Sequence, residues 1–94
     1  MSERTAAALA KLDELLAPLN DLAKTRETGR LIEDVEALRR AVAAFHMEAI
    51  RFRMYSVDRD LKSVGDDPAI RRLYEELRQT LEDAGFQTRS HTAP

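Results

Sequence analysis

The amino-acid sequence predicts an all-α fold, and three observations lead to this prediction. Leucine and other apolar residues recur at spacings of three and four, which places them on one side of an α-helix. The composition, with 34% charged and 5% aromatic residues, is typical of helix-rich soluble proteins. Gly29, Gly65 and Gly85 divide the 94 residues like three helix stops, because glycine tolerates the left-handed conformation just beyond a helix.

The length predicts one domain. We expect a single helical domain over residues 1–86 and a flexible C-terminal tail over residues 87–94. The first residues carry several charges and no run of apolar residues reaches membrane-spanning length, so neither a signal peptide nor a membrane helix is expected. The sequence contains no cysteine, which excludes disulfides and is compatible with a cytoplasmic location.

The first predicted helix covers about residues 3–26. Leu9, Leu12, Leu16 and Leu19 alternate spacings of three and four and form its apolar face. Pro18 lies inside this helix, where proline removes a backbone donor and clashes with the preceding turn. We therefore expect a kink or a break near Pro18.

The middle segment, residues 30–64, contains neither glycine nor proline, and we predict one long helix there. Between Ile50 and Tyr55 apolar residues alternate with larger polar ones, which is the period-two pattern of a half-buried strand. The flanking residues favour helix and include no turn-forming residues, so the strand is the weaker alternative. A single helix of this length would extend for about 50 Å.

The last predicted helix covers residues 68–84 and has clear ends. Asp67 offers a capping carboxylate and Pro68 occupies the first helical position, where its missing N–H costs nothing. Gly85 then ends the helix, and Phe86 is placed to fold back onto Leu81 in a Schellman cap.

Two apolar stripes follow the predicted long helix, one from Leu31 to Phe52 and one from Met47 to Val64. Short connections predict that the first and last helices fold back antiparallel, each covering one stripe. Each end of the long helix would then have only one neighbour, and the uncovered apolar surface predicts a homodimer. A compact three-helix bundle with one wide apolar face is the alternative. The residues predicted for the oligomer interface are Phe45, Met47, Ile50, Phe52 and Met54.

Four polar residues, Arg39, His46, Arg53 and Asp60, recur every seven positions and would form a line between the two stripes. An unpaired buried charge is costly, so we expect the arginines to pair with carboxylates of neighbouring helices or of a second subunit. The candidate partners are Glu14, Asp21, Glu75 and Glu82. The alternative is a small anionic-ligand site, because guanidinium suits phosphate and carboxylate geometry. The histidine could also make assembly depend on pH.

The charge distribution is uneven along the chain. The total of 15 basic and 17 acidic residues, a net charge of −2, argues against a strongly basic nucleic-acid-binding protein. Residues 39–62 carry six basic and three acidic residues. Arg40, Arg51 and Arg59 form the predicted basic surface. The second functional hypothesis is a nucleic-acid accessory protein that uses the basic middle of the long helix, with Arg39, Arg40, Arg51, Arg53 and Arg59.

Motifs for catalysis, metal binding and nucleotide binding are missing from the sequence. No cysteine occurs and no glutamate stands three or four residues from His46, so we expect no metal site. The three isolated glycines form no phosphate-binding loop and no serine stands in a nucleophile motif. We therefore expect a non-enzymatic protein without cofactor. The favoured function is a self-associating interaction module: an adaptor, a regulatory subunit or an inhibitor of a larger protein.

Overall fold

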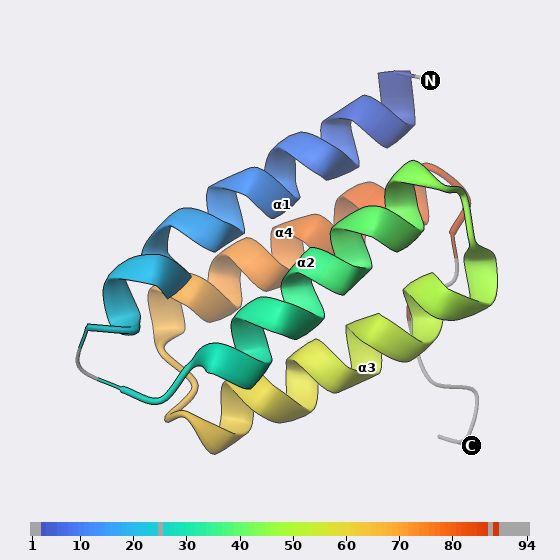
Figure 1. Ribbon diagram of the computed structural model, residues 1–94. Helices are drawn as coiled ribbons and strands as arrows, with labels where there is room; N and C mark the ends of the chain where they lie inside the picture. Colours follow the sequence, from blue (N-terminus) through green and yellow to red (C-terminus); the bar gives the residue numbers. More distant parts are fainter. Residues whose placement is uncertain (1–2, 25, 87, 89–94) are drawn as a thin grey trace, which may run out of the picture.

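The computed structural model describes residues 3–24, 26–86 and 88, and these residues form four helices. Helix α1 spans Glu3–Leu22, α2 spans Gly29–Ala43, α3 spans Met47–Ser63 and α4 spans Pro68–Asp83. Successive helices run antiparallel through short connections (Figure 1). Helix α1 packs against α2 and α4, and α2 packs against α3. The all-α prediction is confirmed, and the strand alternative is excluded because residues 50–55 lie within α3.

The prediction of one helix over residues 30–64, and with it the count of three helices, is wrong. The chain reverses at residues 44–46, so α2 and α3 form a hairpin. Phe45 adopts the left-handed conformation with φ of 61°. Its N–H donates to Val42 O at 3.1 Å, and the His46 N–H donates to Ala41 O at 2.9 Å. This is the hydrogen-bond pattern of a Schellman cap, with phenylalanine at the position where glycine is usual.

A contact with the end of α4 helps to stabilise this unusual cap. The left-handed conformation costs a residue with a side chain about 1–2 kcal/mol. The Phe45 ring lies 4.9 Å from the Phe86 ring, centroid to centroid, and the two planes are tilted by 57°. Such aromatic pairs contribute about 0.5–1.5 kcal/mol. The break between α2 and α3 is therefore supported by a residue far away in the sequence.

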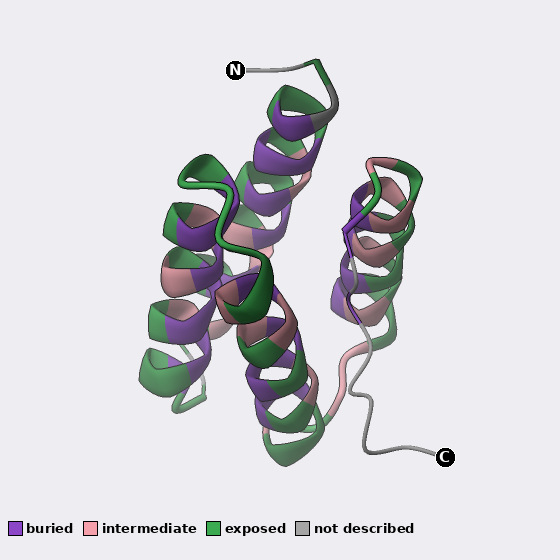
Figure 2. Ribbon diagram, turned by 90° about the vertical axis from the view of Figure 1, so that its right-hand side faces the viewer, coloured by how far each residue is buried: buried purple, intermediate pink, exposed green. Residues whose placement is uncertain are grey.

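The two apolar stripes are buried mostly within one chain. Buried positions face the interior of the bundle along the helices (Figure 2). The buried members of the stripes are at most 1% exposed: Leu31, Val35, Leu38 and Val42 on α2, and Ile50, Met54, Val57 and Leu61 on α3. The greatest extent of the molecule is 36 Å, well below the about 50 Å of the predicted rod. The dimer was predicted because each end of one long helix would leave apolar side chains uncovered. Along these buried residues no such uncovered end exists.

The ends of the other helices agree with the sequence analysis only in part. Helix α1 continues through Pro18 without a break and ends at Leu22 rather than near residue 26. At the start of α4, Asp67 Oδ1 accepts hydrogen bonds from the backbone N–H groups of Ala69 and Ile70 at 2.9 and 3.1 Å. At its end, the Phe86 N–H donates to Leu81 O at 2.9 Å. Both predicted caps of α4 are confirmed.

The predicted tail falls almost entirely outside the described residues. Thr88 is described, and it is buried. Its hydroxyl donates to Glu82 Oε2 on α4 at 2.8 Å. At this one position the prediction of a flexible tail does not fit, because the Thr88 side chain is buried and bonded to α4.

Gly29 differs in conformation from Gly65 and Gly85, which both have positive φ, and this difference allows a test of the caps. Gly29 is the first residue of α2 and not a helix stop, whereas Gly85 has φ of 94° just after α4. We expect Gly85→Ala to lower the free energy of unfolding by about 1–2 kcal/mol, because alanine is strained at positive φ. Gly29→Ala should raise it by up to about 1 kcal/mol, since alanine loses less backbone entropy on folding. Urea denaturation of both variants measures the difference, and equal effects would contradict this assignment.

Candidate functional site

The polar line predicted along one helix does not exist, because the chain reverses at its second member. Arg39 lies near the end of α2, His46 lies exposed in the turn, and Arg53 and Asp60 lie on α3. Arg39 Nε donates to Asp13 Oδ1 on α1 at 2.9 Å, and Arg53 Nη1 donates to Asp34 Oδ1 on α2 at 3.0 Å. Both arginines thus bind carboxylates of neighbouring helices, as in the ion-pair interpretation, although neither acid was among the predicted partners.

Asp60 forms a polar cluster with Asp34 across the interface of α2 and α3. Both carboxylates are buried. Burial, and after it the neighbouring Asp34, raises the pKa of Asp60 to about 6, although Arg59 opposes the shift. The Arg59 guanidinium lies 3.5 Å from Asp60 Oδ1, and the buried Oδ2 has no hydrogen-bond partner among the described residues. Arg59 therefore neutralises the buried carboxylate of Asp60 only in part.

Tyr74 occupies the space between α3 and α4. It is 1% exposed, and its hydroxyl donates to Met54 O at 2.8 Å and accepts from Arg78 Nη2 at 3.0 Å. The guanidinium carbons of Arg71 and Arg78 each lie 5.1 Å from the ring centroid. Burial raises the pKa of Tyr74 to about 12. The ring, with an arginine on either side along α4, joins two helices that contact each other little through their backbones.

The arginine next to Tyr74 is held by acids of three segments. Arg71 Nη1 donates to Asp58 Oδ1 on α3 at 2.6 Å, and Arg71 Nε donates to Asp66 Oδ1 in the connecting turn at 2.8 Å. Glu75 on α4 lies 3.5 Å from the same guanidinium. These ion pairs fix the turn between α3 and α4. They leave this arginine engaged inside the fold rather than directed at a ligand.

The sequence contains a signal for burial of Asp34 and Tyr74, although no role was predicted for either residue. Asp34 follows Leu31 by three residues and precedes Leu38 by four, which places it on the apolar face of α2. Tyr74 follows Ile70 by four residues and therefore shares the apolar face of α4. A polar group on such a face is buried and needs a partner.

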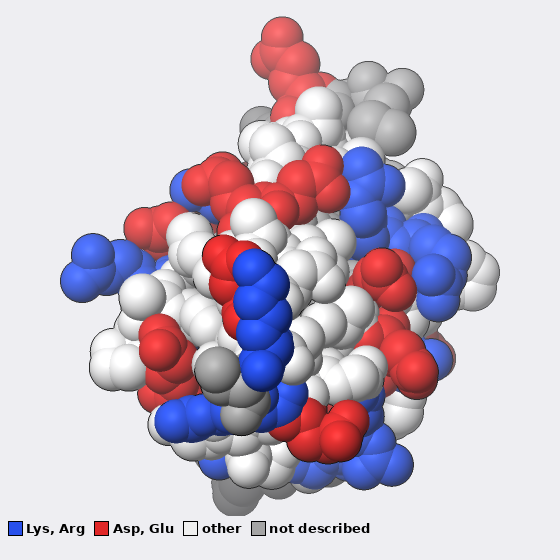
Figure 3. Space-filling view, turned by 60° about the vertical axis from the view of Figure 1, so that its left-hand side comes forward, with Lys and Arg blue, Asp and Glu red and all other residues white. Residues whose placement is uncertain are grey.

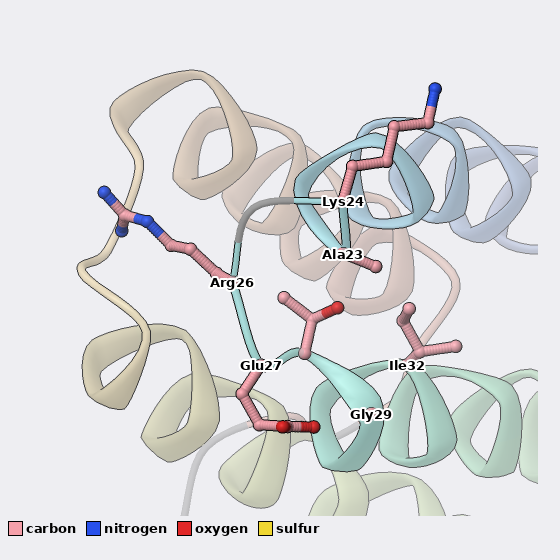
Figure 4. A pocket seen from close by; sticks show the side chains of 7 residues that line it. Ala23, Lys24, Arg26, Glu27, Gly29 and Ile32 are labelled. Atoms are coloured by element: carbon pink, nitrogen blue, oxygen red, sulfur yellow. The ribbon is translucent and has the colours of Figure 1, made fainter.

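A hollow of about 450 Å³ lies between the end of α1 and the start of α2. Lys24, Arg26 and Glu27 line it, but their charged ends point in three different directions (Figure 4). Arg26 Nη1 instead donates to Val64 O at the end of α3. Ligand sites bring a few polar groups together on one point, so this hollow lacks the geometry of a binding site.

Among the residues that the structure describes, the large apolar side chains left exposed lie close together in the sequence. The large apolar side chains that stay exposed are Phe45 at 59%, Met47 at 41%, Phe52 at 60% and Tyr55 at 50%. All four belong to the turn after α2 and to the first half of α3, and we call them the 45–55 patch. Three of them were predicted for an oligomer interface. Ile50 and Met54, predicted with them, face the interior and are fully buried, so they are unavailable to a partner.

Basic residues border the 45–55 patch. The Arg53 guanidinium carbon lies 5.4 Å from the Phe52 ring centroid, and that of Arg59 lies 6.0 Å from the Tyr55 ring centroid. Arg51 lies half-buried on the same helix, whereas Arg40 is exposed on α2.

On the face that Figure 3 shows, acidic and basic side chains are interspersed. That face carries no large field of one sign.

Within residues 3–24, 26–86 and 88, no three side chains of histidine, aspartate or glutamate are arranged to hold a metal ion. None of the four helices combines the length and apolar content that a membrane span requires. In comparisons with other proteins, no protein-family model, curated protein or solved structure matches this chain.

Proposed function

We propose that this protein is a small, non-enzymatic helical module that self-associates through the 45–55 patch and binds another protein, as an adaptor, a regulatory subunit or an inhibitor. The observation that carries the proposal is the location of the exposed large apolar residues. The core is closed within the chain, yet four such residues stay exposed on one short stretch. Large apolar side chains that a fold leaves exposed near one another often mark interaction sites.

The conformation of Phe45 supports the same proposal. This residue holds a strained left-handed conformation and still presents 59% of its surface to solvent. Strained backbone persists where the surrounding structure enforces it, and it is concentrated at functional sites. Aromatic residues such as Phe52 and Tyr55 also bring large contact area at low entropic cost, which makes them frequent anchors of interfaces.

The polar groups of the interior favour a non-enzymatic role. Asp60 and Tyr74, whose pKa values are strongly shifted, lie between packed helices. Catalytic groups with shifted pKa values usually line a cleft that a substrate can enter. The ion pairs of these helices instead tie neighbouring elements together. We expect the module to work in the cytoplasm.

The test is removal of the patch. We expect Phe52→Ser with Tyr55→Ser to weaken self-association at least about tenfold, because buried aromatic anchors contribute about 1–3 kcal/mol each at interfaces. Sedimentation velocity over a concentration series measures this. The matched control is Glu36→Ser with Arg40→Ser, which alters two exposed residues on α2 and should leave association unchanged. Equal association of both double variants would contradict the proposal.

A second candidate, single-stranded nucleic-acid binding, has one observation in its favour. Arg53 and Arg59 lie next to the exposed rings of Phe52 and Tyr55, and bases stack on aromatic side chains beside cationic groups. The net charge of −2 weighs against it. Titration with a single-stranded oligonucleotide at low salt separates the candidates: binding that weakens steeply with salt would favour the second.

A further inference from the structure

The outer face of α3 carries an ordered sequence of charges and rings. Glu48, Phe52, Tyr55 and Arg59 follow one another at spacings of four, three and four, and all four are exposed. At about 100° per residue they lie within an arc of about 60° on the helix. The face therefore presents, from its N-terminal end, an acid, two aromatic rings and a base. Such a pattern specifies its partner more closely than apolar surface alone.

The pattern is complementary to itself when it is reversed. Its midpoint lies between residues 53 and 54, with the two rings next to it and the two charges farther out. If a second α3 crosses antiparallel over that midpoint, Phe52 faces Tyr55 of the second copy and Glu48 faces Arg59 of the second copy. Both pairs form in one register, with each charge about 8 Å from the midpoint at 1.5 Å per residue.

We infer that the occupant of the 45–55 patch is a second copy of this chain, docked α3 on α3 in antiparallel orientation across a twofold axis between residues 53 and 54. This inference rests on the proposed function, and it names the partner and the register. A twofold axis forms each contact twice, so two aromatic pairs are flanked by two ion pairs. The opposite faces of the two helices remain packed in their own bundles, where Ile50 and Met54 are buried.

The charges select this orientation against the parallel one. In a parallel pair Glu48 would face Glu48 of the second copy and Arg59 would face its own equivalent, and like charges opposed at an interface repel. Arg59 can form this pair and keep its own ion pair, since its Nε lies 3.5 Å from Asp60 Oδ1 while 53% of its side chain stays exposed. Two aromatic pairs make a small interface, and small interfaces belong to weak complexes.

The experiment is a charge swap on the full chain. Sedimentation equilibrium from about 10 μM to about 1 mM covers the affinities of weak complexes. We expect Glu48→Arg and Arg59→Glu each to raise the dimer dissociation constant about tenfold, since each sets like charges against each other. Arg59→Glu also removes the ion pair with Asp60, so urea denaturation first shows that each variant is folded. The variant with both changes should return to within about threefold of the parent, because it reverses the pairs without losing them. Glu33→Arg, at an exposed position on α2, is the control without effect.

Disulfide trapping reports the orientation directly, because the chain has no cysteine of its own. We expect a mixture of Glu48→Cys and Arg59→Cys chains to form mixed disulfide dimers under mild oxidation, whereas each variant alone does not. A disulfide requires two Cα atoms within about 7 Å of each other, and only residues that face each other across the dimer meet this requirement. Parallel pairing would give the reverse result, with each variant cross-linking to itself.

The outcomes separate this inference from the proposed function. If the double charge swap restores the dimer, and disulfides form only between Glu48→Cys and Arg59→Cys chains, the results support both this inference and the proposed function. If the double swap does not restore the dimer, or if the single charge changes do not weaken it, this pairing is wrong, although the chain still self-associates. A chain that stays monomeric up to the highest concentration overturns both the second copy as occupant and the self-association part of the proposed function.

Discussion

Replacing Tyr74 with alanine is expected to lower the free energy of unfolding by about 3–5 kcal/mol, the range for truncating a buried aromatic side chain. The ring is 1% exposed and fills the space between α3 and α4. Its removal leaves a cavity and also deprives Arg71 and Arg78 of the ring that lies between them. Domains of this size are stable by about 5–15 kcal/mol. The substitution would therefore remove a large part of the total, as urea denaturation can measure.

Two further variants separate the contribution of the Tyr74 hydroxyl from that of the buried ring. Tyr74→Phe keeps the ring and removes the hydroxyl, which leaves Arg78 Nη2 without this acceptor, so we expect a loss of about 1–3 kcal/mol. Tyr55→Ala is the matched control, because it truncates the same residue type at a half-exposed position on α3. At protein concentrations too low for association it should change stability by no more than about 0.5 kcal/mol. Similar losses in Tyr74→Ala and Tyr55→Ala would contradict the described packing.

Asp60→Asn is expected to stabilise the protein at pH 7 and to remove part of its pH dependence. The pKa of Asp60 is about 6 in the folded chain against 3.8 for a free aspartate. Since the folded state binds this proton more tightly, its contribution to stability is complete below pH 3.8 and is lost as the pH rises through about 6. One pKa unit corresponds to about 1.4 kcal/mol, so the gain at pH 7 should be about 1–3 kcal/mol. The asparagine amide could also donate to Asp34.

Asp58→Asn is the control with the opposite sign, two residues away on the same helix. Burial alone would raise the pKa of Asp58, but hydrogen bonds from Arg71 and Lys62 outweigh it and hold that pKa below its usual value. This carboxylate therefore stabilises the fold above the unfolded pKa of 3.8, and the contribution is lost as the pH falls through the lower folded value. We expect Asp58→Asn to destabilise the protein at pH 7. Denaturant titrations at pH 4 and pH 7 measure both variants, and a gain from Asp60→Asn that is equal at the two pH values would refute the account.

Much of the fold follows from local patterns in the sequence. The spacing of apolar residues predicts helical structure throughout, and Asp67-Pro68 and Gly85-Phe86 predict both ends of α4 correctly. Leu31, Val35, Ile50 and Met54 belong to predicted stripes and are buried. These features depend on residues within one or two turns of one another. Local backbone geometry decides them, so the linear order of residues is sufficient.

The candidate site was predictable only in part. Phe45, Met47 and Phe52 were predicted for an interface and are exposed, whereas the arginine line was predicted from a continuous helix that the fold interrupts. Whether an apolar residue near the turn faces the core or solvent depends on where the chain reverses. The periodicity of the sequence carries that information only while the helix continues.

The sequence by itself determined the helical class, the ends of α4 and most of the core, because helix periodicity and caps are properties of neighbouring residues. The tertiary structure decided that residues 30–64 form two helices and that the 45–55 patch stays exposed. At the break, Phe45 takes a conformation that glycine would adopt without strain, and the ring that supports it belongs to Phe86, after α4. A contact between residues so distant in the chain exists only once the bundle has formed.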